Sequence, residues 1–268
     1  MSAPKFDGLY ISTSQVKTYL RCPRQYEFRY VRGLDPAFVP LALAFGSAIH
    51  AALAHCYNQI QSSGSCPSLE EIQSVFAACW AAAQDGPLPL QIERKGDTPD
   101  HLEKGLAMMA VFHAGLLRNQ LPVVLAVEEP FSIEVHDPDT GEALEERLVG
   151  TLDLVVEEAE GPVVVEHKSS AKKWTEDQVR FDLQLTAYRI AARKMGLGAP
   201  SLRLQLLTKT KQPAVYVEAL HRDNLDEADF LHTVVGVLRA IDAKAFYPVR
   251  GWQCRTCPFV QACLDTAR

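Results

Sequence analysis

The amino-acid sequence predicts an α/β protein whose central β-sheet is flanked by helices. The middle of the chain contains runs rich in Val and Leu that are separated by short polar turns, which is typical of β-hairpins. Helical patterns precede these runs and also lie between the later ones. With 268 residues, 47% of them apolar, the chain can bury the core of one large or two modest domains.

The first 121 residues are predicted to be mainly helical. Ser and Thr cap candidates introduce a helix at 12–19, and 25–31 continues it after the Cys22-Pro23 step. Further helices are expected at 41–61, 68–83 and 99–119. The last two have the character of an inserted helical subdomain, and they contain no chemical motif.

Two hairpins are predicted to follow this helical region. Strands at 123–136 and 144–156 flank an Asp-Pro-Asp-Thr-Gly turn, and a strand at 163–167 returns across the polar turn at 157–162. The remaining elements are expected to be a helix at 174–194, strands at 202–208 and 214–220, and a helix at 223–244 before a cysteine-containing tail.

The second hairpin brings two carboxylates together. If its strands pair antiparallel about the middle of the turn, Asp153 lies opposite Glu166, with Cβ atoms about 5 Å apart. Glu166 and Lys168 then share one face of the strand, with His167 between them. Two close carboxylates among apolar neighbours repel each other, and a divalent cation such as magnesium or manganese would relieve the repulsion. A solvated hairpin edge explains an isolated pattern of this kind equally well.

Two other polar side chains are candidates for the same site. Gln184 and Tyr188 lie four residues apart, so a helix places them on one face, beside the sheet that carries the carboxylates. His50 follows Gly46 by four residues in a strongly apolar helix. Taken alone, Gln184 and Tyr188 also fit an ordinary helix surface, and His50 also fits a histidine that is packed on an apolar helix.

Charge and hydropathy restrict the class of protein. The formal net charge of −6 does not favour a nucleic-acid binder, but local basic patches rather than the total charge determine phosphate contacts. No stretch reaches the roughly 18 apolar residues that a membrane span needs. Because no secretory signal precedes the seven cysteines, we expect a cytoplasmic chain rather than a disulfide framework.

The cysteines are distributed unevenly. Cys254, Cys257 and Cys263 form a C-x2-C-x5-C pattern near the C-terminus, which lets three thiolates converge but leaves a fourth ligand missing locally. Cys22 stands far away, among basic and aromatic residues. The other three cysteines are expected to be packed or exposed residues rather than ligands.

An ordered set of motifs resembles a known family. The motifs are SQVKTYLRCPRQYEFRYV near the N-terminus, GSAIH at 46–50, GTLD at 150–153, EHK at 166–168, QLTAY at 184–188 and the C-terminal cysteine triplet. In this order they resemble RecB-like nucleases of the PD-(D/E)XK superfamily, and in particular its iron-sulfur subset, which includes AddB-type nuclease domains and CRISPR-adaptation exonucleases. The proline of the superfamily name is replaced here by Leu152, although Gly-x-x-Asp is the common form in this branch.

The resemblance implies a restriction-endonuclease-like α/β core with a central mixed β-sheet flanked by helices. It also implies an N- and C-terminal iron-sulfur module around that core. The expected parts are the N-terminal half of the module at 1–40, a helical region at 41–121, the nuclease core at 122–246 and the cysteine tail at 247–268.

The resemblance also implies a role for each site residue. His50, Asp153, Glu166 and the backbone carbonyl of His167 would bind Mg²⁺ or Mn²⁺, and Lys168 would orient or activate the attacking water. Gln184 and Tyr188 would position the strand or support the site. Cys22, Cys254, Cys257 and Cys263 would bind a 4Fe-4S cluster, for which zinc is the rival occupant because four thiolates also suit that ion.

These expectations together describe a metal-dependent DNA exonuclease. Its substrate would be DNA that is single-stranded or has free ends, and its partner could be a helicase or a CRISPR-adaptation protein. The alternative is a non-catalytic DNA-binding or partner-binding subunit that retains the fold, against which the intact Asp153, Glu166 and Lys168 argue.

Overall fold

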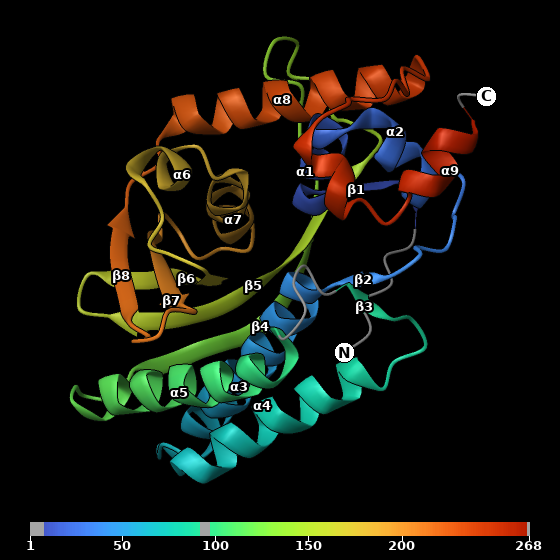
Figure 1. Ribbon diagram of the computed structural model, residues 1–268. Helices are drawn as coiled ribbons and strands as arrows, with labels where there is room; N and C mark the ends of the chain where they lie inside the picture. Colours follow the sequence, from blue (N-terminus) through green and yellow to red (C-terminus); the bar gives the residue numbers. More distant parts are fainter. Residues whose placement is uncertain (1–7, 92–96, 267–268) are drawn as a thin grey trace.

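The computed structural model describes residues 8–91 and 97–266. Its centre is a six-stranded mixed sheet in the order β1-β5-β6-β7-β8, with β4 also paired to β5 (Figure 1). The strands are β1 (Tyr10–Ser12), β4 (Val123–Ile133), β5 (Arg147–Glu158), β6 (Gly161–Ser170), β7 (Ser201–Thr208) and β8 (Val215–Leu220). The β1–β5 and β6–β7 pairs are parallel, and the other three pairs are antiparallel. The prediction of a central mixed sheet flanked by helices is therefore confirmed.

Helices cover both faces of the sheet. The long helices α3 (Leu41–Ser63), α4 (Leu69–Gln84) and α5 (Asp97–Leu117) form the layer drawn below the sheet in Figure 1. The opposite layer contains α1 (Thr13–Arg21), α6 (Glu176–Arg180), α7 (Leu183–Lys194) and α8 (Asn224–Asp242). Among the described residues, no helix is both long enough and apolar enough to cross a membrane.

Alternation of side chains along the strands divides the core in two. Val163 and Val165 of β6 pack into the cluster beneath α3, whereas Val164 packs into the cluster that contains α7 and α8. This is the period of two that a strand buried on both faces requires. The fixed alternation also determines which face of the sheet each polar residue of β6 meets.

Short elements join the two ends of the chain. After α1, the chain continues through α2 (Pro23–Tyr26) and η1 (Glu27–Val31), a wide helical turn in which the Arg32 N–H donates to the Glu27 carbonyl. The C-terminal tail forms η2 (Trp252–Thr256) and α9 (Val260–Asp265), which lie beside α2 in Figure 1. A two-stranded sheet of β2 (Val39–Pro40) and β3 (Leu90–Gln91) lies beside this region.

The expected helix at 174–194 is divided into two helices. α6 ends at Arg180, and α7 begins after Asp182, whose carboxylate accepts hydrogen bonds from the N–H groups of Gln184 and Leu185. A side chain that caps the N-terminus in this way begins a new helix. The interruption matters for the site because it fixes the first turn of α7.

Candidate metal centre and cysteine pocket

The sheet divides at the two carboxylates of the second hairpin. Pairing between β5 and β6 ends with Leu154 opposite Val165, and the next opposed positions are Asp153 and Glu166. The predicted antiparallel register is therefore confirmed. Beyond this point β5 continues beside β1 and β4, and β6 continues beside β7. In place of a further ladder bond, the His167 N–H donates to Asp153 Oδ2 at 2.8 Å.

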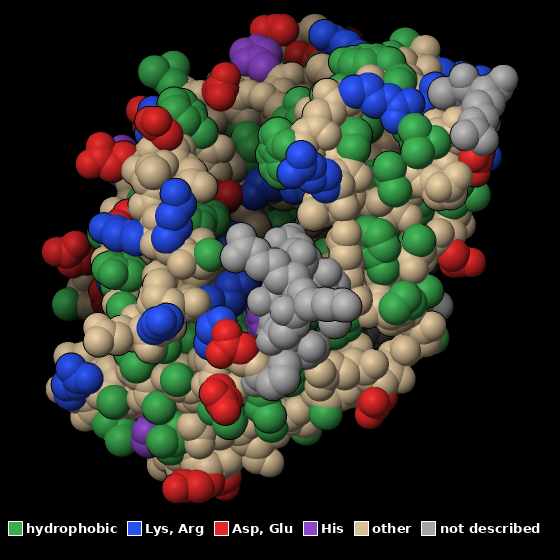
Figure 2. Space-filling model, in the orientation of Figure 1, with side chains coloured by type: hydrophobic (Ala, Val, Ile, Leu, Met, Phe, Trp, Pro, Cys, Tyr) green, Lys and Arg blue, Asp and Glu red, His purple; other side chains and the backbone are tan. Residues whose placement is uncertain are grey.

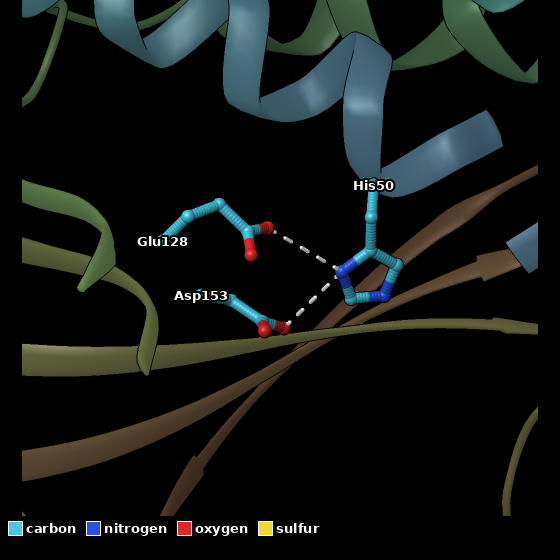
Figure 3. A group of neighbouring side chains, drawn as sticks. All are labelled: His50, Glu128 and Asp153. Atoms are coloured by element: carbon cyan, nitrogen blue, oxygen red, sulfur yellow. Dashed lines mark ion pairs between the residues drawn. The ribbon is translucent and has the colours of Figure 1, made fainter. Parts of the chain in front are cut away.

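Two residues from other elements complete this cluster. His50 of α3 directs Nδ1 toward Glu128 Oε1 at 3.8 Å and Asp153 Oδ2 at 3.7 Å (Figure 3). One ligand atom from each of these three residues lies within 4.8 Å of the others, so the group could bind a metal ion. Glu128 lies on β4 directly opposite Asp153, between the pairs Val127–Leu154 and Glu129–Leu152.

Glu128 was not among the residues expected from the sequence. It has a φ of 49°, an unusual backbone conformation for a residue with a Cβ atom. The β4–β5 ladder keeps one register from Ile133–Leu148 to Val127–Leu154, which places Glu128 opposite Asp153, and the register shifts only beyond this stretch, between Val124 and Ala126. Three adjacent strands thus each place one carboxylate at the point where the sheet divides.

Burial makes this group electrostatically unfavourable without a cation. Asp153 is 6% exposed and Glu166 is fully buried. Burial and the charge of Glu166 raise the pKa of Asp153 well above its ordinary value. Burial alone would lower the pKa of His50, but hydrogen bonding to Glu128 and the charges of Asp153 and Glu166 raise it overall. A bound divalent ion would offset the repulsion between the carboxylates.

The predicted residues Lys168, Gln184 and Tyr188 form one hydrogen-bonded network with the carboxylates. Lys168 Nζ contacts Glu166 Oε1 and donates to Gln184 Oε1 at 2.7 Å. The Gln184 amide group in turn donates to Glu166 Oε2 at 3.1 Å and to the Tyr188 hydroxyl at 2.8 Å. Tyr188 donates to Asp153 Oδ1 at 3.3 Å. Gln184 and Tyr188 therefore orient both carboxylates and the lysine.

His167 contributes differently from His50. Its ring is 3% exposed and stacks on Tyr57, with centroids 5.6 Å apart and planes 8° apart. Burial lowers the pKa of this ring to about 3, so it is neutral at ordinary pH. Among the described residues, neither ring nitrogen has a hydrogen-bond partner. The prediction that the backbone carbonyl of His167 binds metal remains a prediction.

Gly150 of the GTLD motif has a steric role beside the site. It pairs with Phe131 across β4 and β5, and a Cβ atom at this position would lie 2.6 Å from the Phe131 ring. Phe131 meets Tyr188 edge to face, with centroids 6.3 Å apart. The missing side chain therefore lets Phe131 lie over the strand and support the tyrosine that binds Asp153.

The four predicted cluster ligands line a single pocket. Cys22 is contributed by the junction of α1 and α2, and Cys254, Cys257 and Cys263 by the C-terminal tail. Burial raises the pKa of the Cys257 thiol, and the other three cysteines raise it further. The backbone also ties the two segments together, because the Arg24 N–H donates to the Tyr247 carbonyl at 3.1 Å. Sequence positions more than two hundred residues apart thus meet here.

The fold and the site together define an α/β protein with a group of carboxylates and a histidine that could bind a metal ion where its mixed sheet divides. Comparison with family models agrees with this class, since the chain belongs to the PD-(D/E)XK nuclease superfamily, whose model matches residues 10–264. The chain is thus a nuclease-superfamily protein along almost its whole length.

The chain is also similar to solved structures. A "Putative exonuclease" from Eubacterium rectale is 16% identical, with a TM-score of 0.52 over 92% of this chain and 86% of that one. The crystal structure of SSO0001 is 15% identical, with a TM-score of 0.45 over 96% of this chain and 86% of that one. No curated protein matched the sequence.

Proposed function

We propose that this protein is a Mg²⁺- or Mn²⁺-dependent deoxyribonuclease that hydrolyses phosphodiester bonds, and that its substrate is single-stranded DNA attacked from an end. The observation that supports this most is the meeting of Asp153, Glu128 and Glu166 at the division of the sheet, with His50 above them and Lys168 beside them. The carboxylate oxygens that make up most of this group suit a hard divalent cation.

Five residues would bind the metal ion that hydrolysis requires. His50, Glu128, Asp153, Glu166 and the carbonyl of His167 would hold the ion, which supplies positive charge to the phosphate and lowers the pKa of a bound water. Hydrolysis adds the water oxygen to phosphorus as the bond to the leaving oxygen breaks. A proton passes from the water to the leaving oxygen or to solvent.

Lys168 is suited to orient the attacking water or to bind the phosphate. Burial lowers its pKa, but the neighbouring carboxylates, Glu166 first, raise the pKa overall. The ammonium therefore stays charged at neutral pH. Because Glu166 and Gln184 hold this group, it is positioned before a substrate binds.

The direct test is cleavage of end-labelled single-stranded DNA in the presence of Mn²⁺ or Mg²⁺. We expect short products, no cleavage in EDTA and no cleavage by Asp153→Ala. Parallel reactions with 5′- and 3′-labelled DNA would reveal the polarity. Full activity of Asp153→Ala would contradict the assignment of the metal centre.

We also propose that the four-cysteine pocket holds a 4Fe-4S cluster. Tetrahedral zinc would bring its thiolates to within about 3.8 Å of one another, given Zn–S bonds of about 2.3 Å. Among the described residues, the group with three ligand atoms all within 4.8 Å is at the carboxylates and not at the cysteines. The lack of such a close group of thiols among the described residues, together with the apolar Phe28 and Phe259 in the lining, favours the larger group.

The proposed cluster would be structural, since hydrolysis needs no electron transfer. It would close a loop of more than two hundred residues between Cys22 and Cys254 and so disfavour the unfolded chain. Protein purified without oxygen should be brown, with broad absorption in the blue. Colourless protein with stoichiometric zinc and full activity would refute the cluster.

The biological setting belongs to the same proposal. A nuclease of this kind would act in DNA repair, recombination or CRISPR adaptation, with a helicase or an adaptation protein as partner. Co-purification from cells, with Asp153→Ala to retain uncleaved complexes, would identify such a partner.

A further inference from the structure

A pocket next to the metal centre connects it to the N-terminal module. Asp153 and Tyr188 line one side, and Arg29 and Tyr30 of η1 line another. The remaining lining is mostly aromatic and hydroxyl-bearing, and it includes Tyr10, Ser12, Thr151 and Phe131. Asp153 is the only carboxylate among the described residues that line this hollow, which we call the η1 pocket.

A second pocket lies against the same cluster from the α3 side. It is lined by His50, Glu128 and Lys168 together with the small residues Gly46 and Ser47. The two pockets share no lining residue, but they meet at the metal centre because His50 and Glu128 face Asp153. An extended molecule bound across the centre would therefore occupy both pockets.

The basic side chain that lines the η1 pocket is that of Arg29. Among the ion pairs that the described residues form, none includes Arg29, and its guanidinium lies 5.2 Å from the centre of the Tyr30 ring. Arg189 and Arg193, by contrast, both pair with Glu227. On the face drawn in Figure 2, Lys and Arg side chains gather around the central hollow.

The segment that carries Arg29 is basic in a chain that is acidic overall. Residues 21–32 contain four arginines and a single acid, Glu27, which pairs with Arg24. The whole chain carries a formal charge of −6. Arg29 is the arginine of this segment that lines the η1 pocket, and a cation unpaired among the described residues beside the proposed phosphodiesterase centre favours a polyanion as the occupant.

We propose that the η1 pocket binds the nucleotides next to the scissile phosphate of single-stranded DNA, with Arg29 on a backbone phosphate and Tyr30 against a base. This inference rests on the proposed nuclease function and adds the residues that hold the strand. A guanidinium binds phosphate oxygens through two parallel hydrogen bonds. Tyr26 supports Tyr30 from one side, with ring centroids 5.0 Å apart, so the aromatic platform is held in place.

The test measures binding of fluorescent oligothymidylate to the full-length protein in EDTA, where the strand stays intact. Arg29→Ala should weaken binding about tenfold, as expected for one charge-assisted contact. It should also reduce the slope of log affinity against log salt by about 0.7, the contribution of one phosphate contact on a single strand. Arg29→Lys should retain the slope and lose part of the affinity, because it keeps the charge without the planar fork.

Arg32→Ala is the matched control. Arg32 lies three residues further along the chain, is also exposed and pairs with no acid among the described residues, but it does not line the η1 pocket. Arg32→Ala should bind and cleave DNA like the wild type. Equal affinities and equal salt slopes for Arg29→Ala and Arg32→Ala would overturn the inference. Thermal melting shows whether each variant is folded.

The two proposals fail in distinguishable ways. If the wild type binds oligothymidylate through Arg29 but cleaves no DNA with Mn²⁺, the nuclease proposal fails and the strand site stands. If the wild type cleaves DNA and Arg29→Ala has an unchanged KM, the strand site fails and the nuclease proposal stands. A KM raised about tenfold by Arg29→Ala, with Arg32→Ala unchanged, supports both.

Discussion

Replacing Asp153 with Asn should stabilise the metal-free protein while it abolishes metal binding. Burial and Glu166 raise the pKa of Asp153 well above its value in an unfolded chain. Each unit of this rise costs the folded protein somewhat more than ~1 kcal/mol at neutral pH. The Asn side chain keeps one acceptor for the His167 N–H or the Tyr188 hydroxyl and weakens the other bond, a loss of about 1 kcal/mol. Relief of the buried charge should therefore exceed the loss.

The stability difference between the wild type and Asp153→Asn should depend on pH. A raised folded-state pKa means that the folded protein binds more protons than the unfolded chain between the two pKa values, so stability falls as pH rises through that window. Asp153→Asn removes this term. Its melting temperature should match the wild type near pH 4 and exceed it by about 2 to 4 °C at pH 7.5, for a chain of this size.

Differential scanning calorimetry in EDTA and then with added Mn²⁺ checks both parts. A metal ion that binds only the folded state stabilises that state, so the wild type should melt at a higher temperature with Mn²⁺. The melting temperature of Asp153→Asn should change little. A lower melting temperature for Asp153→Asn at all pH values would refute the reasoning. It would mean that the carboxylate serves mainly as a structural acceptor rather than as a repelled charge.

Three further substitutions test other parts of the site. Glu128→Gln should raise the Mn²⁺ concentration for half-maximal activity about tenfold, whereas Glu129→Gln, its exposed neighbour, should not, as metal titrations of activity can establish. Gly150→Ala should lower both the melting temperature and kcat, because its Cβ would displace Phe131; unchanged values would contradict the steric argument. Lys168→Met should lower kcat about a hundredfold with little change in KM, and a change in KM alone would assign the lysine to binding instead.

The sequence was sufficient to predict the pairing of Asp153 with Glu166, but not that of Asp153 with Glu128. The first pair follows from a short hairpin, in which the middle of the turn determines every opposed position. The second depends on a change of register near the turn of the first hairpin, between the His136–Ala143 bridge and the Ile133–Leu148 pair. If the register of that bridge continued along both strands, Ala126 would face Asp153, and such a change of register cannot be located from a pattern of alternating side chains.

Two other features depend on contacts that are distant in sequence. β1 consists of three residues, which are too few for a recognisable strand pattern. It pairs with residues 147–149 of β5, beyond the stretch that pairs with β6. The break between α6 and α7 follows from Asp182, which caps α7 and pairs with Lys17 of α1. Local helical propensity continues through Asp182. The break could therefore not be predicted from the sequence pattern, because it depends on an ion pair with a different helix.

The Lys17–Asp182 pair connects α1 to the hydrogen-bonded network of Lys168, Gln184 and Tyr188. Asp182 is largely buried and accepts the first N–H groups of α7, which carries Gln184 and Tyr188. Burial alone would raise the pKa of Asp182, but Lys17 and Lys168 lower it overall. A lowered pKa contributes stability that is present above the unfolded value and is lost as pH falls through the folded value.

Replacing Lys17 with Met should therefore narrow the pH range of the proposed nuclease activity. Without the ammonium the pKa of Asp182 rises, so its carboxylate becomes protonated, and stops capping α7, at a higher pH than in the wild type. Gln184 then no longer holds Lys168 and Glu166 in position. We expect the acid limb of the kcat profile to move to higher pH, with kcat near the wild-type value at alkaline pH. Lys17→Arg, which retains the ion pair, should keep the wild-type profile. A uniform loss of kcat at every pH would show that Lys17 acts only by supporting the fold, because a titrating cap cannot produce it.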